Sequence, residues 1–92
     1  MSVYVRVIRQ FHGHPESAYR DLYLIAVPAP GAQLSGVGPR LARLEAVTFA
    51  PIWGGAAGWG RPWVTLVLEP MVGDTLAIAQ AEGWTERLTG AS

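Results

Sequence analysis

The chain has 92 residues, a formal net charge of zero and no cysteine. This length corresponds to one small domain, which buries about 60 to 65 % of the surface of its unfolded chain. The lack of cysteine excludes disulfides, thiolate metal ligands and a cysteine nucleophile. A small core must therefore be sufficient by itself or be shared with a partner. We expect residues 1–92 to form a single domain that associates with itself or with another protein.

The charged residues exclude several classes of function. Seven basic residues, all of them arginine, balance seven carboxylates. Without lysine there can be no Schiff-base enzyme and no P-loop. A neutral chain has no long-range field to attract a polyanion, so we do not expect nucleic acid as a partner. No apolar run is long enough to span a membrane, and the start lacks the pattern of a signal peptide. We expect a cytoplasmic protein with no membrane partner and no cofactor.

The first two expected elements are β-strands. Residues 2–11 alternate in polarity, which places Val3, Val5 and Val7 on one face of a half-buried strand. After a loop, residues 19–27 become apolar on both faces towards their end, which is typical of a more central strand. We predict that this second strand pairs back on the first as a hairpin.

The middle of the chain is harder to interpret. Residues 28–39 are rich in proline and glycine and have no usable periodicity. A loop of this length is functional, part of an interface or partly mobile, and its small neutral residues favour an interface or a spacer. Residues 40–47 fit a helix or a strand; we expect a strand over 43–52 and leave open a helical turn before it. Residues 63–69 are a clear strand, with Val64, Leu66 and Leu68 on one face, and this strand should pair with the preceding one.

The last expected element is a helix that begins at Gly73 and Asp74. The aspartate is a favoured N-cap residue. Gly83 is costly inside a helix, so the helix either breaks there or packs very closely. The positions on its expected buried face are Ala77, Ala81, Trp84 and Leu88. Together these elements predict an α+β fold: a four-stranded antiparallel sheet made of two hairpins, with one C-terminal helix packed on one face.

The start of this helix carries one family resemblance. The run Gly73-Asp74-Thr75-Leu76, followed by Ile78-Ala79-Gln80, Gly83 and Leu88, resembles the opening of a LysM module. The resemblance implies binding to N-acetylglucosamine polymers. The spacing from Leu76 to Ile78 is one residue shorter than in that family. We therefore interpret the motif as a helix N-cap that converged on the same residues.

The strongest candidate for a working surface is a segment rich in tryptophan and glycine, residues 53–63, between the third and fourth expected strands. It holds Trp53, Trp59 and Trp63, three of the four tryptophans of the chain. Trp53 and Trp63 could simply pack across a hairpin. Trp59 has no obvious core to enter, and Arg61 lies two residues away; these two residue types are enriched at binding hot spots. A sugar or a base stacked on the aromatic rings is the other reading.

A metal site is the first alternative. His12 and His14 flank a glycine in the loop after the first strand, and Glu16 or Asp21 could supply a third ligand. The signal is weak because zinc needs at least three well-placed ligands. Histidines beside glycine and proline are usually solvated turn residues.

A catalytic site is the second alternative. Glu45 and Glu69 could face each other across the third and fourth strands as an acid and base pair, but a slip of one residue would separate them. We assign no catalytic residue. The leading hypothesis is a non-catalytic protein-interaction or structural subunit, with Trp53, Trp59, Arg61 and Trp63 as its interaction residues. The alternative is a small-ligand binding domain or minor enzyme that uses the same segment as a lid.

Overall fold

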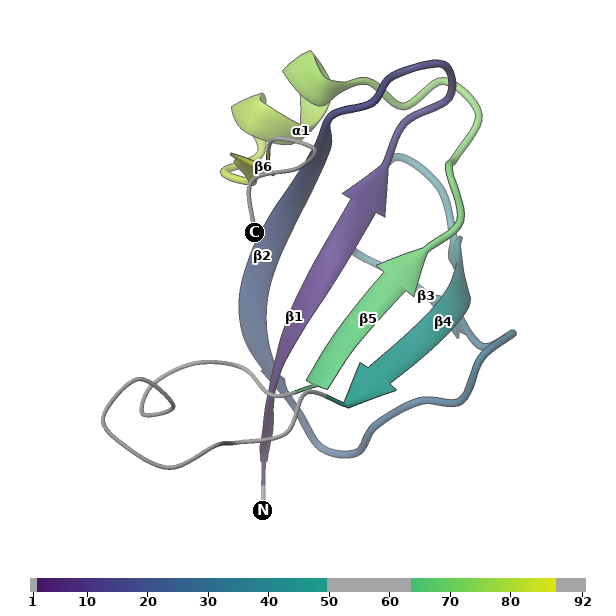
Figure 1. Cartoon of the computed structure of the whole chain (residues 1–92), viewed down its shortest axis with the longest axis vertical. Helices are drawn as coiled ribbons and strands as arrows, with labels where there is room; N and C mark the ends of the chain where they lie inside the picture. Colours follow the sequence, from purple (N-terminus) through teal and green to yellow (C-terminus); the bar gives the residue numbers. More distant parts are fainter. Residues whose placement is uncertain (1, 50–63, 88–92) are drawn as a thin grey trace.

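A computed structural model of the chain describes residues 2–49 and 64–87. Within them it shows a mixed six-stranded sheet and one short helix, which confirms the α+β class (Figure 1). The strand order is β3-β4-β5-β1-β2-β6. In chain order the elements are β1 (Val3–Gln10), β2 (Ser17–Leu24), β3 (Gln33–Leu34), β4 (Ala42–Phe49), β5 (Val64–Leu68), α1 (Leu76–Ala81) and β6 (Thr85–Arg87).

Both expected hairpin pairings are present. β1 and β2 are antiparallel along their whole length, from Val3 opposite Leu24 to Gln10 opposite Ser17. β4 and β5 are antiparallel too, with a bulge between Leu44 and Ala46 that shifts their register. The alternating polarity of β1 was a reliable guide, since the side chains of Val5 and Val7 are completely buried.

The expectation of a purely antiparallel sheet was wrong. β1 and β5 are parallel, from Val5 opposite Val64 to Ile8 opposite Val67. The first strand of one hairpin therefore lies beside the second strand of the other, and these two strands form the centre of the sheet. The prediction that β2 is more central than β1 was also wrong, because β2 lies nearer the edge. Parallel neighbours require a long crossover connection, and such a pairing leaves no local mark in the sequence.

Two short strands were not expected. β3 pairs with β4 through Gln33 and Leu34, inside the segment that was interpreted as a loop. β6 pairs with the first three residues of β2, where Thr85 lies opposite Tyr19. Both strands have three residues or fewer, too short for an alternating pattern to be recognised.

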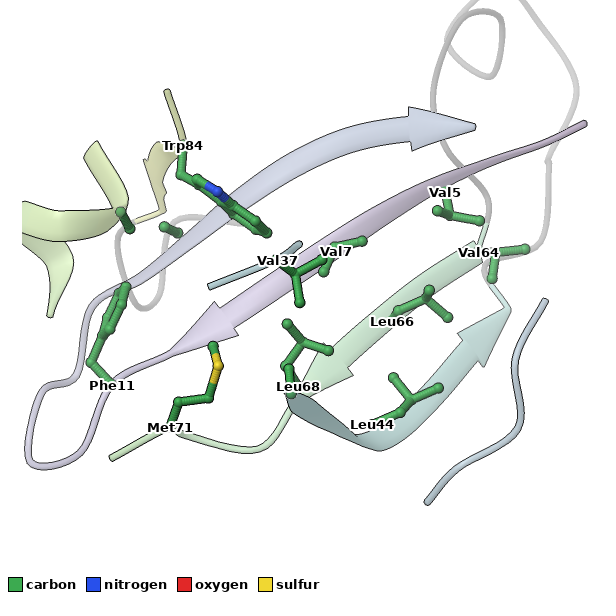
Figure 2. Packing of buried hydrophobic residues seen from close by; sticks show 13 residues of the cluster. Val5, Val7, Phe11, Val37, Leu44, Val64, Leu66, Leu68, Met71 and Trp84 are labelled. Carbon is green, nitrogen blue, oxygen red and sulfur yellow. The ribbon is translucent and has the colours of Figure 1, made fainter. Parts of the chain in front are cut away.

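The core lies on one face of the sheet, and irregular segments cover it (Figure 2). Leu66 and Leu68 of β5 join the valines of β1 in this cluster and are completely buried. Val37, Met71 and Trp84 pack onto it from outside the main strands. A Cβ atom on Gly38 would lie 2.5 Å from Met71 Cε. Glycine thus lets the chain pass close over the core, and part of the segment 28–39 serves packing.

The helix is shorter than expected, and its N-cap is a different residue. Thr75 is the N-cap, and its Oγ1 accepts a hydrogen bond of 3.2 Å from the amide of Ile78. The helix ends because Gly83 adopts a left-handed conformation, with φ of 92°. The amides of Gly83 and Trp84 bond back to the carbonyls of Gln80 and Ala79, the pattern of a Schellman motif. Trp84 is therefore outside the helix, although it is buried as expected.

Asp74, the expected N-cap, instead binds a buried arginine. Arg9 on β1 has a completely buried side chain, and its Nε and Nη2 each donate a 2.5 Å hydrogen bond to the Asp74 carboxylate. Its Nη1 donates to Glu82 at 2.8 Å, and its guanidinium lies 5.2 Å from the ring of Trp84. Burial alone would lower the pKa of Arg9, but the bonds to the two carboxylates outweigh this effect and raise that pKa.

The buried pair leads to a stability prediction. Asp74→Asn leaves the Arg9 charge buried and only partly compensated, so we expect it to lower the free energy of unfolding by about 3 kcal/mol. Urea denaturation of both proteins measures this loss. Asp21→Asn is the matched control, because it removes the same charge from the partly exposed pair with Arg6 and should cost about 1 kcal/mol or less. Equal losses would show that burial of Arg9 does not control its contribution.

Candidate interaction surface

The predicted interaction residues Trp53, Trp59, Arg61 and Trp63 all lie outside the described residues. The two positions that border the segment are described. Phe49 ends β4 and Val64 begins β5, and these residues are opposite each other in the sheet. Val64 is buried, whereas 61 % of Phe49 is exposed. The chain thus leaves and re-enters the sheet at one place, and a large apolar side chain is accessible there.

The strand registers show what else lies at this end of the sheet. The start of β1 lies opposite the end of β2, where Val3 pairs with Leu24. The starts of β1 and β5 are neighbours, so the end of β4 lies there as well (Figure 1). Tyr23 and Ile25 are 67 % and 91 % exposed and lie at this same end. We call the group Tyr23, Ile25 and Phe49 the apolar end.

The sheet face opposite the core adds further aromatic side chains beside the apolar end. The rings of Tyr4 and Tyr23 are stacked, with their centroids 4.8 Å apart. The next pair on this face is Arg6 and Asp21, in which Arg6 donates two hydrogen bonds of 2.8 and 3.0 Å to the carboxylate. The guanidinium of Arg6 also lies 4.3 Å from the ring centroid of Tyr19. These side chains are half-buried or exposed, whereas Ile8, on the same face of β1, is buried. We call this surface the open face.

The electrostatics of the open face are balanced. The bond to Asp21 is the main reason that the pKa of Arg6 is raised, so both charges of this pair are stabilised by each other. Loss of solvation raises the pKa of Tyr4, and the nearby Asp21 and Tyr23 raise it further. A neutral tyrosine pair and a compensated ion pair leave little net charge here.

The structure also places the histidine and glutamate candidates. His12 and His14 are exposed in the turn between β1 and β2, and His14 Nδ1 lies 3.9 Å from Glu16. Within residues 2–49 and 64–87, no three histidine or acidic side chains are close enough to hold a metal ion. Glu45 accepts a hydrogen bond from the side chain of Gln10, and Glu69 lies 3.5 Å from Arg43. The two carboxylates thus have separate partners.

Sequence reasoning did not identify the apolar end or the open face. The signal in the sequence was present: Tyr19, Asp21 and Tyr23 alternate along β2, as Tyr4 and Arg6 do along β1. What was missing was the register that places these residues opposite each other. Phe49 lies at the same end of the sheet as Tyr23 and Ile25 only through the pairing of β5 with β1, and it is on the covered face, in line with Val64 and Val5, whereas Tyr23 is on the open face.

Comparisons with known proteins do not assign the chain to a family. No protein-family model matches it, and no curated protein or solved structure matches it significantly. In the described part of the chain, no helix has the length and apolar character needed to cross a membrane.

The exposure of Tyr23 can be tested through stability. Tyr23→Ser removes a ring that is mostly in water and loses only part of one cross-strand aromatic pair, so it should lower the free energy of unfolding by about 1 kcal/mol or less. Leu66→Ala in the same sheet should cost about 2 to 5 kcal/mol. Thermal or urea denaturation in dilute solution distinguishes the two. A loss in Tyr23→Ser as large as in Leu66→Ala would show that Tyr23 belongs to the core.

Proposed function

We propose that this chain is a non-catalytic protein-interaction or structural subunit. It docks on another copy of itself or on a larger assembly through residues 53–63, with Trp53, Trp59, Arg61 and Trp63 as the interaction residues. One observation carries this proposal. The described residues on both sides of this segment belong to an end of the sheet where Tyr23, Ile25 and Phe49 are exposed.

The cost of this exposure supports a partner. Scattered apolar side chains on a surface are normal, but several large ones at one place are typical of a binding surface. Six large hydrophobic residues of the described chain are exposed, and three of them lie at this end of the sheet: Tyr23 and Ile25 two residues apart at the end of β2, and Phe49 on the covered face at the end of β4. Arginine and tryptophan in the attached segment are the residue types that contribute most to binding energy at protein interfaces.

The pairing of the charged groups supports a non-catalytic role. Catalytic sites hold ionisable groups in a cleft with perturbed pKa values, ready to act on a substrate. In the described residues, the closest charged groups are engaged with each other: Arg6 with Asp21, Arg9 with Asp74 and Glu82. No buried side-chain nitrogen or oxygen of these residues lacks a hydrogen-bond partner. Each of these pairs has a structural explanation within the fold.

Light scattering of the purified chain tests the proposal. We expect a mass above that of the monomer, or retention of the chain on a larger assembly. Trp59→Ala should weaken the association by about 30-fold, the effect of losing one aromatic hot spot.

Leu41→Ala is the matched control. Leu41 is 62 % exposed but precedes β4, at the opposite end of the sheet, so its replacement should leave association unchanged. A monomer that binds no partner, or equal behaviour of the two variants, would refute the proposal.

A further inference from the structure

Among the described residues, the outer edge of β2 is paired only in part. The inner edge of this strand pairs with β1 over all eight residues, but the outer edge pairs with β6 only at Ser17–Tyr19. In an antiparallel strand, successive residues direct their amide and carbonyl groups to alternate sides. Within the described part of the chain, no strand therefore pairs with the outward groups of residues 20–24. An extended strand is the ligand that such an edge binds.

Beyond Arg20, the described residues show none of the usual devices that prevent pairing at this edge. Natural edge strands are protected by proline, lysine, bulges or a covering segment. Residues 20–24 contain no proline or lysine, and their pairing with β1 is regular. Both charged side chains are already engaged: Arg20 donates a 2.9 Å hydrogen bond to the carbonyl of Glu82, and Asp21 binds Arg6.

The opposite edge of the sheet is better protected. β3 pairs with the first residues of β4, and Leu44 exchanges hydrogen bonds of 2.7 and 2.8 Å with the backbone of Gly31 and Ala32. The bulge after Leu44 further disturbs the regular strand. Among the described residues, Ala46–Phe49 of β4 also have no partner strand on their outer side, but this run is shorter than residues 20–24 of β2 and follows the bulge, so β2 offers the longer regular edge.

We propose that β2 pairs with β2 of a second copy of the chain, antiparallel, about a two-fold axis that passes through Tyr23. This inference rests on the proposed function, for which it names the partner and a contact surface. The same edge on both copies satisfies the closed two-fold symmetry that is commonest among dimers. Residues 22–24 of one copy then pair with residues 24–22 of the other.

The charges and neighbours of β2 favour this axis over those through Asp21 and Leu22. Two-fold pairing that keeps both covered faces on the same side must centre on a residue. An axis through Asp21 would bring two carboxylates together, which is destabilising. An axis through Leu22 would place the second copy's Leu24 beside Arg20. The outer side of Arg20 is already occupied, since its guanidinium bonds to Glu82 and lies 5.6 Å from the Trp84 ring.

An axis through Tyr23 avoids both conflicts and covers apolar surface. The two half-buried leucines, Leu22 and Leu24, then face each other across the axis on the covered face. On the open face, Tyr23 meets its own copy, so the stacked pair with Tyr4 becomes a row of four rings. Ile25, the most exposed large hydrophobic residue described, lies at the end of the new contact beside Asp21 of the second copy.

Cysteine cross-linking tests this axis in the full-length chain. The chain has no cysteine of its own, so Tyr23→Cys introduces one thiol per copy. Residues directly opposite in an antiparallel pair have Cα atoms about 4.5 or 5.5 Å apart, within the range of a disulfide. Under mild oxidation we expect a disulfide-linked dimer to form about tenfold faster than in the control, because the two thiols are held together.

Thr48→Cys is the matched control. Thr48 is exposed and on the same face as Tyr23, but it lies on β4 at the other side of the sheet. Equal rates of cross-linking in the two variants would overturn the two-fold axis.

Hydrogen exchange in the unmodified chain gives a second measurement, which does not depend on the loss of the Tyr23 ring. The outward amides among residues 21–25 should exchange more slowly in concentrated than in dilute solution, while those of β4 do not change. Exchange that is independent of concentration would overturn the inference.

The two proposals can fail separately. If the chain associates and Trp59→Ala abolishes this, but Tyr23→Cys cross-links no faster than Thr48→Cys, then the edge pairing is wrong and the proposed function stands. If Tyr23→Cys cross-links and Trp59→Ala has no effect on the mass, then β2 forms the contact and residues 53–63 do not.

Discussion

The ion pair between Arg9 and Asp74 is the interaction on which the rest of the fold depends. Arg9 projects from β1, the strand that lies between β2 and β5, into the covered face of the sheet. Its partner lies 65 residues later, just before α1. A desolvated pair of this kind contributes little net stability relative to an apolar core. An arrangement of the chain that separated the two groups would, however, leave a buried charge without its partner. The pair therefore fixes where the chain returns after β5, and with it the positions of Trp84 and β6.

The sequence could predict local structure but not the contacts that join it. Alternation along β1 and β5 was sufficient to find these strands and their buried faces, and Gly83 was correctly recognised as a possible break in the helix. The parallel pairing of β1 with β5 could not be found, because alternation shows which face is buried and not which strand is the neighbour. Asp74 shows the same limit. It stands beside Thr75, both are good N-cap residues, and the distant Arg9 decides between them.

The candidate surface likewise has one part that the sequence could predict and one part that it could not. Composition alone drew attention to residues 53–63, because three tryptophans in a short segment are unusual. Tyr23, Ile25 and Phe49 are ordinary residues in the sequence, and each had a plausible place in a core. Only the registers of three strand pairs bring them to one end of the sheet. A surface made by topology leaves little trace in a single sequence, whereas a surface made by composition is visible at once.

The uneven protection of the sheet connects the apolar end with the edge of β2. Residues 28–39 contribute β3 and a cover for the core on the side of β4, so the chain pairs the first part of β4, as far as Leu44, with its own backbone. On the other side, β6 is only three residues long and closes β2 as far as Tyr19. The part of β2 that has no partner strand among the described residues includes Tyr23 and ends just before Ile25, and both of these side chains are exposed. Backbone groups that can hydrogen-bond to a further strand and exposed apolar side chains thus occur on the same few residues at the end of β2. One partner strand can satisfy both, which is why a second copy of β2 fits this edge better than a ligand that contacts side chains alone.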